Sequence, residues 1–464
     1  MHFMPYRNSL GLLQWGSFCS PIGMEVLMPS LLPSVLLLFM LLSLSVPASL
    51  RAAGSASGLW PIKEKGYFGY IDRSGVVKVR PAFRDARPFH ENLAAVRGKG
   101  GWGFIDTAGQ ILVPVKYEEV KPFSSGLARV KKAGKWGFVD IGGRETFSAR
   151  FDWAMDLREE MALVWDGHKY GYVGRGGRLA VAPRFAEACE FWEGLAAVKQ
   201  GTSWGFIDKS GTMVIESRFA RAENFHEGLA RVEIEGKAGF IDRTGRIVIP
   251  PAFDPDLFES FSEGLSVIRQ GNRYGYIDKA GSVKVEPTYW WAYEFREGAA
   301  RVKEDGAKWV LIDPAGKTMG AGRFDDIGDF HEGLARVRID REYGFVNPQG
   351  SLAVPVIYSA ALPFSEGLAA VHVEGIHLSL PMRPRPSNPP VLLYKNLPFT
   401  GERIPAMAWG KGWGYIDGHG TTVIPPGFDY VGSFTDGLAE AAGGGRCGYI
   451  DRSGRFVWET DPPK

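Results

Sequence analysis

The chain has 464 residues, with 54 basic and 52 acidic side chains that leave a net charge of +2, and 13% of its residues are aromatic. Its apolar content of 45% is that of a folded protein and excludes an intrinsically disordered chain. Basic and acidic residues interleave without a run of lysine or arginine, so nucleic acid is not expected as a partner.

Residues 1–58 are predicted to be an export segment followed by a short linker. The apolar, uncharged core of this segment spans residues 31–46, which suits a signal peptide, and Val46-x-Ala48 fits a small-residue cleavage site. The alternative is an uncleaved membrane anchor, although an anchor usually needs about 20 apolar residues. Both alternatives predict an extracytoplasmic location (periplasmic, cell-surface or secreted), with membrane contact only through an uncleaved segment.

Residues 59–464 consist of a repeat of about 34 residues, marked by an aromatic residue followed by glycine. The intact pairs are Phe68-Gly69, Trp102-Gly103, Trp136-Gly137, Tyr170-Gly171, Trp204-Gly205, Tyr274-Gly275, Tyr343-Gly344 and Trp413-Gly414. Three copies keep the register with one member changed, namely Ala238-Gly239, Trp309-Val310 and Cys447-Gly448. The step from Gly344 to Gly414 is two periods long, which predicts a degenerate copy near residues 372–408 and about twelve copies in all.

The composition of each unit favours strands over helices. Several glycines and a regularly placed proline would cost a helix several kcal/mol per unit, and the apolar spacing is two, as in Trp136 and Phe138. We predict three short antiparallel strands per unit, the third ending at a proline such as Pro114. An Asp-x-x-Gly turn joins the second strand to the third, with the Asp accepting backbone N–H bonds and the Gly at positive φ.

Each small sheet has apolar residues on both faces, so its neighbours in the array must cover it. The predicted fold is therefore all-β, a tandem array of about twelve three-stranded antiparallel units. The units are expected to stack as an open superhelix or solenoid, or as propeller-like rings, because twelve exceeds the roughly four to eight blades usual in a closed propeller.

This pattern resembles the bacterial WG-repeat family, named for the Trp-Gly pair that begins here at Trp102, Trp136, Trp204 and Trp413. The resemblance covers residues 59–464. Departures from the pattern include Gly174 and Asn347 where other copies have Asp. The resemblance implies a repeat fold that binds or scaffolds, and it supplies no catalytic residues.

Motifs that suggest catalysis or metal binding have simpler interpretations within the repeat. Ser203 in Gly201-Thr202-Ser203-Trp204-Gly205 matches the nucleophile elbow of hydrolases, but that elbow requires a helix after the strand. The repeated Asp lacks the density of a calcium loop, and the three cysteines lack metal-ligand spacing. We expect no enzyme activity, no metal and no cofactor.

Tryptophans outside the repeat framework are the candidate binding residues, namely Trp153, Trp165, Trp192, Trp290 and Trp291. Such rings form anchors or stacking surfaces for a ligand, or fill gaps where copies have diverged. The leading prediction is a non-enzymatic exported scaffold that binds a protein partner through an extended surface. The alternative is an array that binds cell-wall or other polysaccharide through these aromatic residues.

Overall fold

A computed structural model describes residues 58–255, 260–306, 308–374, 393–396, 403–406 and 411–460. The predicted export segment, including its core at residues 31–46, lies outside the described residues apart from Gly58. The regular elements of the described residues are all β-strands. None of these residues belongs to a helix long and apolar enough to cross a membrane.

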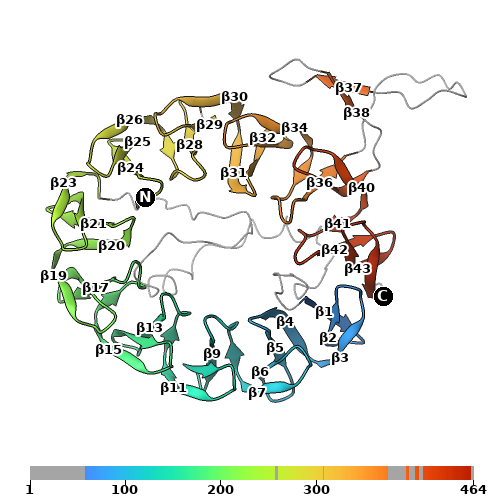
Figure 1. Ribbon diagram of the computed structural model, residues 1–464, viewed down its shortest axis with the longest axis horizontal. Helices are drawn as coiled ribbons and strands as arrows, with labels where there is room; N and C mark the ends of the chain where they lie inside the picture. The colour runs from blue at the N-terminus through green and yellow to red at the C-terminus, as the bar shows by residue number, and fades with distance from the viewer. Residues whose placement is uncertain are drawn as a thin grey trace, which may run out of the picture. The chain divides into compact units, whose positions relative to one another are not determined.

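The chain divides into two units, and each consists of small antiparallel sheets whose strands are consecutive in the chain, except for one sheet of the C-terminal unit that is interrupted by an inserted hairpin. The N-terminal unit ends at Phe261 and also includes residues 279–281, and the rest of the described chain from Ser262 onward forms the C-terminal unit. Figure 1 shows the sheets of each unit lying side by side in chain order, as the blades of a β-propeller do. We number these repeat sheets 1 to 11 along the chain.

The N-terminal unit contains sheets 1 to 6. Their strands are β1 (Leu59–Glu64), β2 (Tyr67–Asp72) and β3 (Val77–Phe83); β4 (Asp85–His90), β5 (Leu93–Arg97), β6 (Trp102–Ile105) and β7 (Ile111–Tyr117); β8 (Glu119–Val120), β9 (Leu127–Lys132), β10 (Lys135–Asp140) and β11 (Glu145–Phe151); β12 (Trp153–Ala154), β13 (Met161–Trp165), β14 (Tyr170–Gly174) and β15 (Leu179–Phe185); β16 (Glu187–Ala188), β17 (Ala196–Gln200), β18 (Ser203–Ile207) and β19 (Met213–Phe219); β20 (Arg221–His226), β21 (Leu229–Ile234), β22 (Lys237–Asp242) and β23 (Ile247–Phe253).

The C-terminal unit contains the strands of sheets 7 to 11 and one separate hairpin. Its strands are β24 (Leu265–Gln270), β25 (Arg273–Asp278) and β26 (Val283–Tyr289); β27 (Trp291–Ala292), β28 (Ala300–Lys303), β29 (Trp309–Ile312) and β30 (Thr318–Phe324); β31 (Asp326–His331), β32 (Leu334–Ile339), β33 (Glu342–Val346) and β34 (Leu352–Tyr358); β35 (Ala360–Ala361), β36 (Ala369–Val373), β39 (Gly412–Ile416) and β40 (Thr422–Phe428); β41 (Tyr430–Val431), β42 (Leu438–Gly443), β43 (Arg446–Asp451) and β44 (Phe456–Thr460); and the hairpin β37 (Leu393–Asn396) with β38 (Arg403–Ala406).

Most sheets have one strand more than the sequence predicts. The three predicted strands are present, and in nine of the eleven repeat sheets of the described chain a short strand from the preceding linker pairs with the first of them. In sheet 3 this strand is β8, where Glu119 pairs with Lys131. The linker between two repeats therefore supplies the first strand of the next sheet.

The sequence predicts a degenerate copy near residues 372–408, and the strand pairing of sheet 10 shows that this prediction is wrong. Strand β36 pairs directly with β39, with His372 opposite Trp413, so the residues between them are an insertion within one sheet. The insertion contributes the separate hairpin β37–β38. This insertion explains why the step from Gly344 to Gly414 is two periods long. The described residues form eleven repeat sheets instead of the twelve predicted.

The aromatic–glycine pair marks the place where the third strand bulges over the second. In sheet 2, Trp102 pairs with Tyr117 and Phe104 pairs with Val113, so Pro114 and two further residues stand opposite Gly103 alone. A Cβ atom on Gly103 would lie 2.3 Å from the carbonyl oxygen of Val113. Only glycine fits beneath this bulge, and the third strand continues past the proline instead of ending there as predicted.

Within each unit, consecutive repeats are joined by a repeated contact between two buried rings. The Phe or Tyr that follows the aromatic–glycine pair packs against the Phe before the next Glu-Gly turn, at 4.7–4.9 Å between ring centroids. The pairs are Tyr70–Phe89, Phe104–Phe123, Tyr172–Phe191, Phe206–Phe225, Phe240–Phe261, Tyr276–Phe295, Phe345–Phe364 and Tyr415–Phe434. Burial raises the pKa of Tyr70, whose hydroxyl donates to the carbonyl oxygen of Arg87 in the next sheet (2.7 Å).

A glutamate carboxylate adds a second connection between sheets. In several repeats the Glu of the Glu-Gly turn accepts a hydrogen bond from the backbone N–H of the corresponding turn in the next repeat, as Glu193 does from Gly228 at 3.0 Å. Glu193 has φ of 50°, which places it in the left-handed region. Glu366 makes the same bond to Gly437, 71 residues further along the chain, at 2.9 Å. This bond confirms that sheets 10 and 11 are neighbours despite the insertion.

The Asp-x-x-Gly turns have the predicted geometry. In sheet 1 the Asp72 carboxylate accepts hydrogen bonds from the backbone N–H groups of Ser74 (2.9 Å) and Val76 (3.0 Å), and Gly75 has φ of 84°. These bonds, led by the one from the Ser74 hydroxyl (2.7 Å), lower the pKa of Asp72 from 3.8 to about 2. Asn347 fills the same position in sheet 9 and accepts from Ser351 at 2.9 Å.

The lowered pKa predicts a pH-dependent contribution to stability. Because the folded-state pKa of Asp72 lies below its unfolded value, its contribution is complete above about pH 4 and is lost as the pH falls to about 2. Asp72→Asn should therefore lower the urea midpoint of unfolding at pH 6, and its difference from wild type should shrink between pH 4 and pH 2. Unfolding curves across this range test the prediction, and a constant difference would contradict it.

The ring contact between sheets predicts a large effect on stability. Phe225 is fully buried against Phe206, so Phe225→Ala should lower the free energy of unfolding by about 3–5 kcal/mol. Ile141, which is 57% exposed, is the control, and Ile141→Ala should change that free energy by no more than about 0.5 kcal/mol. Urea denaturation followed by circular dichroism measures both, and equal effects would count against the ring contact as the main joint.

Candidate functional site

The five candidate tryptophans occupy three different environments. Trp153 and Trp165 are cross-strand partners in sheet 4, both half-buried against the apolar cluster around Tyr172. Trp192 lies at the turn that precedes β17, and Trp290 and Trp291 lie at the start of sheet 8. The five residues therefore do not form one site.

Trp192 belongs to a stack that continues through three repeats. The Arg158 guanidinium lies 4.0 Å from its ring centroid, and the ring of His226 lies 4.6 Å away. These three residues hold the same repeat position in sheets 4, 5 and 6, directly before the turn glutamate. Trp192 is half-buried and packs between residues of the two neighbouring repeats, so it joins repeats.

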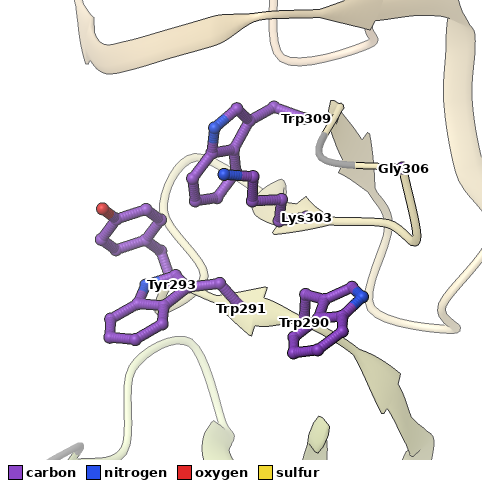
Figure 2. A pocket seen from close by; sticks show the side chains of 6 residues that line it. All are labelled: Trp290, Trp291, Tyr293, Lys303, Gly306 and Trp309. Carbon is purple, nitrogen blue, oxygen red and sulfur yellow. The ribbon is translucent and has the colours of Figure 1, made fainter.

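Trp290 and Trp291 instead line an open pocket. They are 49% and 45% exposed, and together with Tyr293, Lys303, Gly306 and Trp309 they line an open hollow of about 480 Å³ (Figure 2). Tyr293 stacks on Trp309 with ring centroids 5.4 Å apart, and Trp291 packs on Tyr274 of sheet 7 at 5.2 Å. The pocket thus presents several aromatic faces whose positions are fixed by ring contacts.

Strand register places three of the lining residues in one row. Trp291 of β27 pairs with Lys303 of β28, and Lys303 pairs with Trp309 of β29. Directly opposed residues on neighbouring strands point to the same face of a sheet. The pocket is therefore built on the rigid first three strands of sheet 8, with Gly306 contributed by the turn between β28 and β29.

Charged groups border the pocket. The Arg273 guanidinium lies 4.5 Å from the ring centroid of Trp290 and forms an ion pair with Asp305 at 2.6 Å. The Lys303 ammonium lies 5.5 Å from the centroid of Trp309. These distances are within the range of cation–π attraction, so the cations help to hold both rings in place.

Sheet 8 also departs from the aromatic–glycine rule at Val310. The third strand β30 has its usual length, but four residues rather than three stand opposite Val310, because Trp309 pairs with Phe324 and Leu311 with Met319. Two of these four residues are glycines, and Gly320 has φ of 68°. The bulge has one residue more than in most other sheets, which makes room for the buried Val310 side chain.

The residues considered for catalysis and metal binding lie in the strands and turns of the repeat framework. Ser203 is the first residue of β18, opposite Gln200, and it is followed by a strand where a nucleophile elbow requires a helix. The repeated Asp residues accept turn hydrogen bonds, as Asp106 and Asp208 do. No group of three or more potential metal-ligating side chains occurs among the residues that the structure describes.

Sequence reasoning identified two of the six lining residues. Trp309 was assigned to the repeat framework, and Tyr293, Lys303 and Gly306 gave no separate signal. The signal available was positional, since the linker-strand residue opposite the base is acidic in sheets 2, 3, 5 and 9 but is Trp291 in sheet 8. Recognising it requires the register of the linker strand, which was not predicted.

The repeated sheets and the aromatic pocket define a tandem-repeat protein with a small-ligand-sized cavity on one sheet. The chain belongs to the WG containing repeat family, whose sequence profile matches most of its length. The matched segments are residues 68–101, 102–136, 136–164, 170–201, 204–237, 239–274, 274–309, 309–341, 343–375 and 413–442. No curated protein is a significant match to this chain.

Several solved structures are similar to the chain at low sequence identity. A structure of a eukaryotic initiation factor is 9% identical, covers 73% of this chain and 97% of its own, and has a TM-score of 0.40. Hsv2p of Kluyveromyces lactis is 10% identical, covers 55% of this chain and 91% of its own, and has a TM-score of 0.29. BamB of Moraxella catarrhalis is 10% identical, covers 66% of this chain and 95% of its own, and has a TM-score of 0.27.

Proposed function

We propose that this protein is a non-enzymatic repeat scaffold that binds a saccharide ligand in the aromatic pocket of sheet 8. The observation that carries the proposal is the gathering of Trp290, Trp291, Tyr293 and Trp309 around one open cavity. Flat aromatic faces stack against the C–H faces of sugar rings, and two of these tryptophans are about half exposed.

The size of the cavity favours a small ligand over a protein surface. A volume of about 480 Å³ falls within the range of small-molecule pockets. A stable protein–protein interface buries about 800 Å² on each partner, much more than one pocket offers. The pocket therefore supports the polysaccharide alternative more strongly than the protein partner that the sequence first suggested.

The chemistry of the lining is that of a binding site. The side chains of the pocket provide ring faces and one ammonium group, and their geometry is fixed by stacking and strand pairing. Preorganised rings of this kind bind without the cost of ordering flexible side chains. An extracytoplasmic location, which the export segment predicts, is compatible with a polysaccharide ligand and forms part of the proposal.

The proposal predicts that removing the two exposed rings weakens binding. Trp290→Ala/Trp291→Ala should reduce the affinity for a glycan that the wild-type protein binds about 10-fold or more, because each stacking ring contributes on the order of 1 kcal/mol. The measurement is a glycan array followed by co-sedimentation with the polysaccharide that it identifies. Tyr67, which is 51% exposed and lies in sheet 1, provides the control variant Tyr67→Ala, which should bind like wild type.

Thermal unfolding of each variant confirms that any loss of binding is not a loss of fold. Equal retention of the double variant and wild type would refute the pocket as the site. Absence of saccharide binding, together with capture of a purified protein partner that the double variant loses, would assign the pocket to the protein-binding alternative.

A further inference from the structure

The residues that pair across the first three strands follow a charge rule in several sheets. The linker strand carries an acid, the next strand a base, and the middle strand the aromatic of the aromatic–glycine pair. The rows are Asp85–Arg97–Trp102, Glu119–Lys131–Trp136, Glu187–Lys199–Trp204 and Asp326–Arg338–Tyr343. In sheet 5 the acid and base form an ion pair, with the Glu187 carboxylate 2.6 Å from the Lys199 ammonium.

Sheet 8 keeps the base and the aromatic of this row but replaces the acid. Trp291 stands at the acidic position, opposite Lys303. Within the described part of the chain Lys303 forms no ion pair, and its ammonium lies over Trp309. Figure 2 shows this amine among the pocket rings.

The carboxylates nearest in sequence are already engaged. Glu304 pairs with Arg323 at 2.8 Å, and Asp305 pairs with Arg273 at 2.6 Å. Trp291 thus supplies a ring to the pocket and leaves Lys303 without the acidic cross-strand neighbour that sheets 2, 3, 5 and 9 have. A positively charged group at the pocket wall attracts an anionic ligand, and a carboxylate side chain occupies this place in sheets 2, 3, 5 and 9.

We propose that the ligand of the pocket is an acidic saccharide, a uronic acid residue whose carboxylate pairs with Lys303 while its ring stacks on Trp291 or Trp309. This inference rests on the proposed function and names the class of sugar that the same site selects. The ligand carboxylate takes the position that Glu187 holds in sheet 5, so its hydrogen bond to the Lys303 ammonium corresponds to the ion pair between Glu187 and Lys199.

The test compares matched acidic and neutral oligosaccharides. Tetramers of galacturonic, glucuronic and mannuronic acid and their fully methyl-esterified forms are titrated into the full chain, with tryptophan fluorescence as the readout. At least one acid should bind about 10-fold or more tightly than its own ester, and this preference should fall as salt is added. Lys303→Met should bind the acid and its ester equally, because the ring faces remain and the charge is lost.

Two further variants test whether the acid preference depends on Lys303 and on the residue opposite it. Lys131→Met removes the lysine at the same row position in sheet 3, 5.7 Å from the ring centroid of Trp136, and should keep the acid preference. Trp291→Glu places an acid opposite Lys303, as Glu187 stands opposite Lys199 in sheet 5. This glutamate should pair with Lys303 and abolish the preference for the acid over its ester. Folding of each variant is checked by its thermal transition.

The outcomes separate the inference from the proposed function. If esters or neutral oligosaccharides bind as well as the acids, and Lys303→Met changes nothing while Trp290→Ala/Trp291→Ala reduces binding, the acidic ligand is wrong and the saccharide site stands. If no saccharide binds in the titrations or on the array, the proposed function fails, and the acidic ligand fails with it.

Discussion

The fold depends on one constraint: a sheet of three or four short strands with two apolar faces cannot exist alone. Each face needs a neighbour at about 10 Å, and the buried ring contact between consecutive repeats meets this requirement. Phe206 against Phe225 and Tyr276 against Phe295 repeat the same geometry at 4.9 Å in the two units. Stability in such an array comes mainly from interfaces between neighbouring repeats.

Glycine makes that contact possible in most copies. At Gly103 and Gly205 the third strand crosses so close to the second that a side chain would collide with its carbonyl oxygens. The bulge allows the middle strand to keep large rings on the side that faces the next repeat. The turn glutamates then lock the register, since a carboxylate such as that of Glu332 bonds to backbone N–H groups of the next turn at 2.7 Å.

The sequence predicts features that are local and repeated. The Asp72 turn, the positive φ of Gly75 and the alternation around Trp136 follow from residue types within a few positions, and the structure confirms them. The linker strand was missed because two residues such as Glu119 and Val120 carry no periodicity. The insertion after β36 was misread because its length happens to match one repeat, and only the pairing of His372 with Trp413 reveals it.

The pocket arises where one repeat departs from the framework without losing the fold. In sheet 8 the ring of Trp291 stands where four other sheets have an acid, and Val310 stands where most sheets have a glycine, with a longer bulge opposite it. Neither change disturbs the ring contacts by which sheet 8 packs on sheet 7, because Tyr276 still reaches Phe295 and donates its hydroxyl to the carbonyl oxygen of Tyr293. A repeat array can therefore acquire a binding site by local substitution, since the neighbouring sheets supply the rigidity that a binding pocket requires.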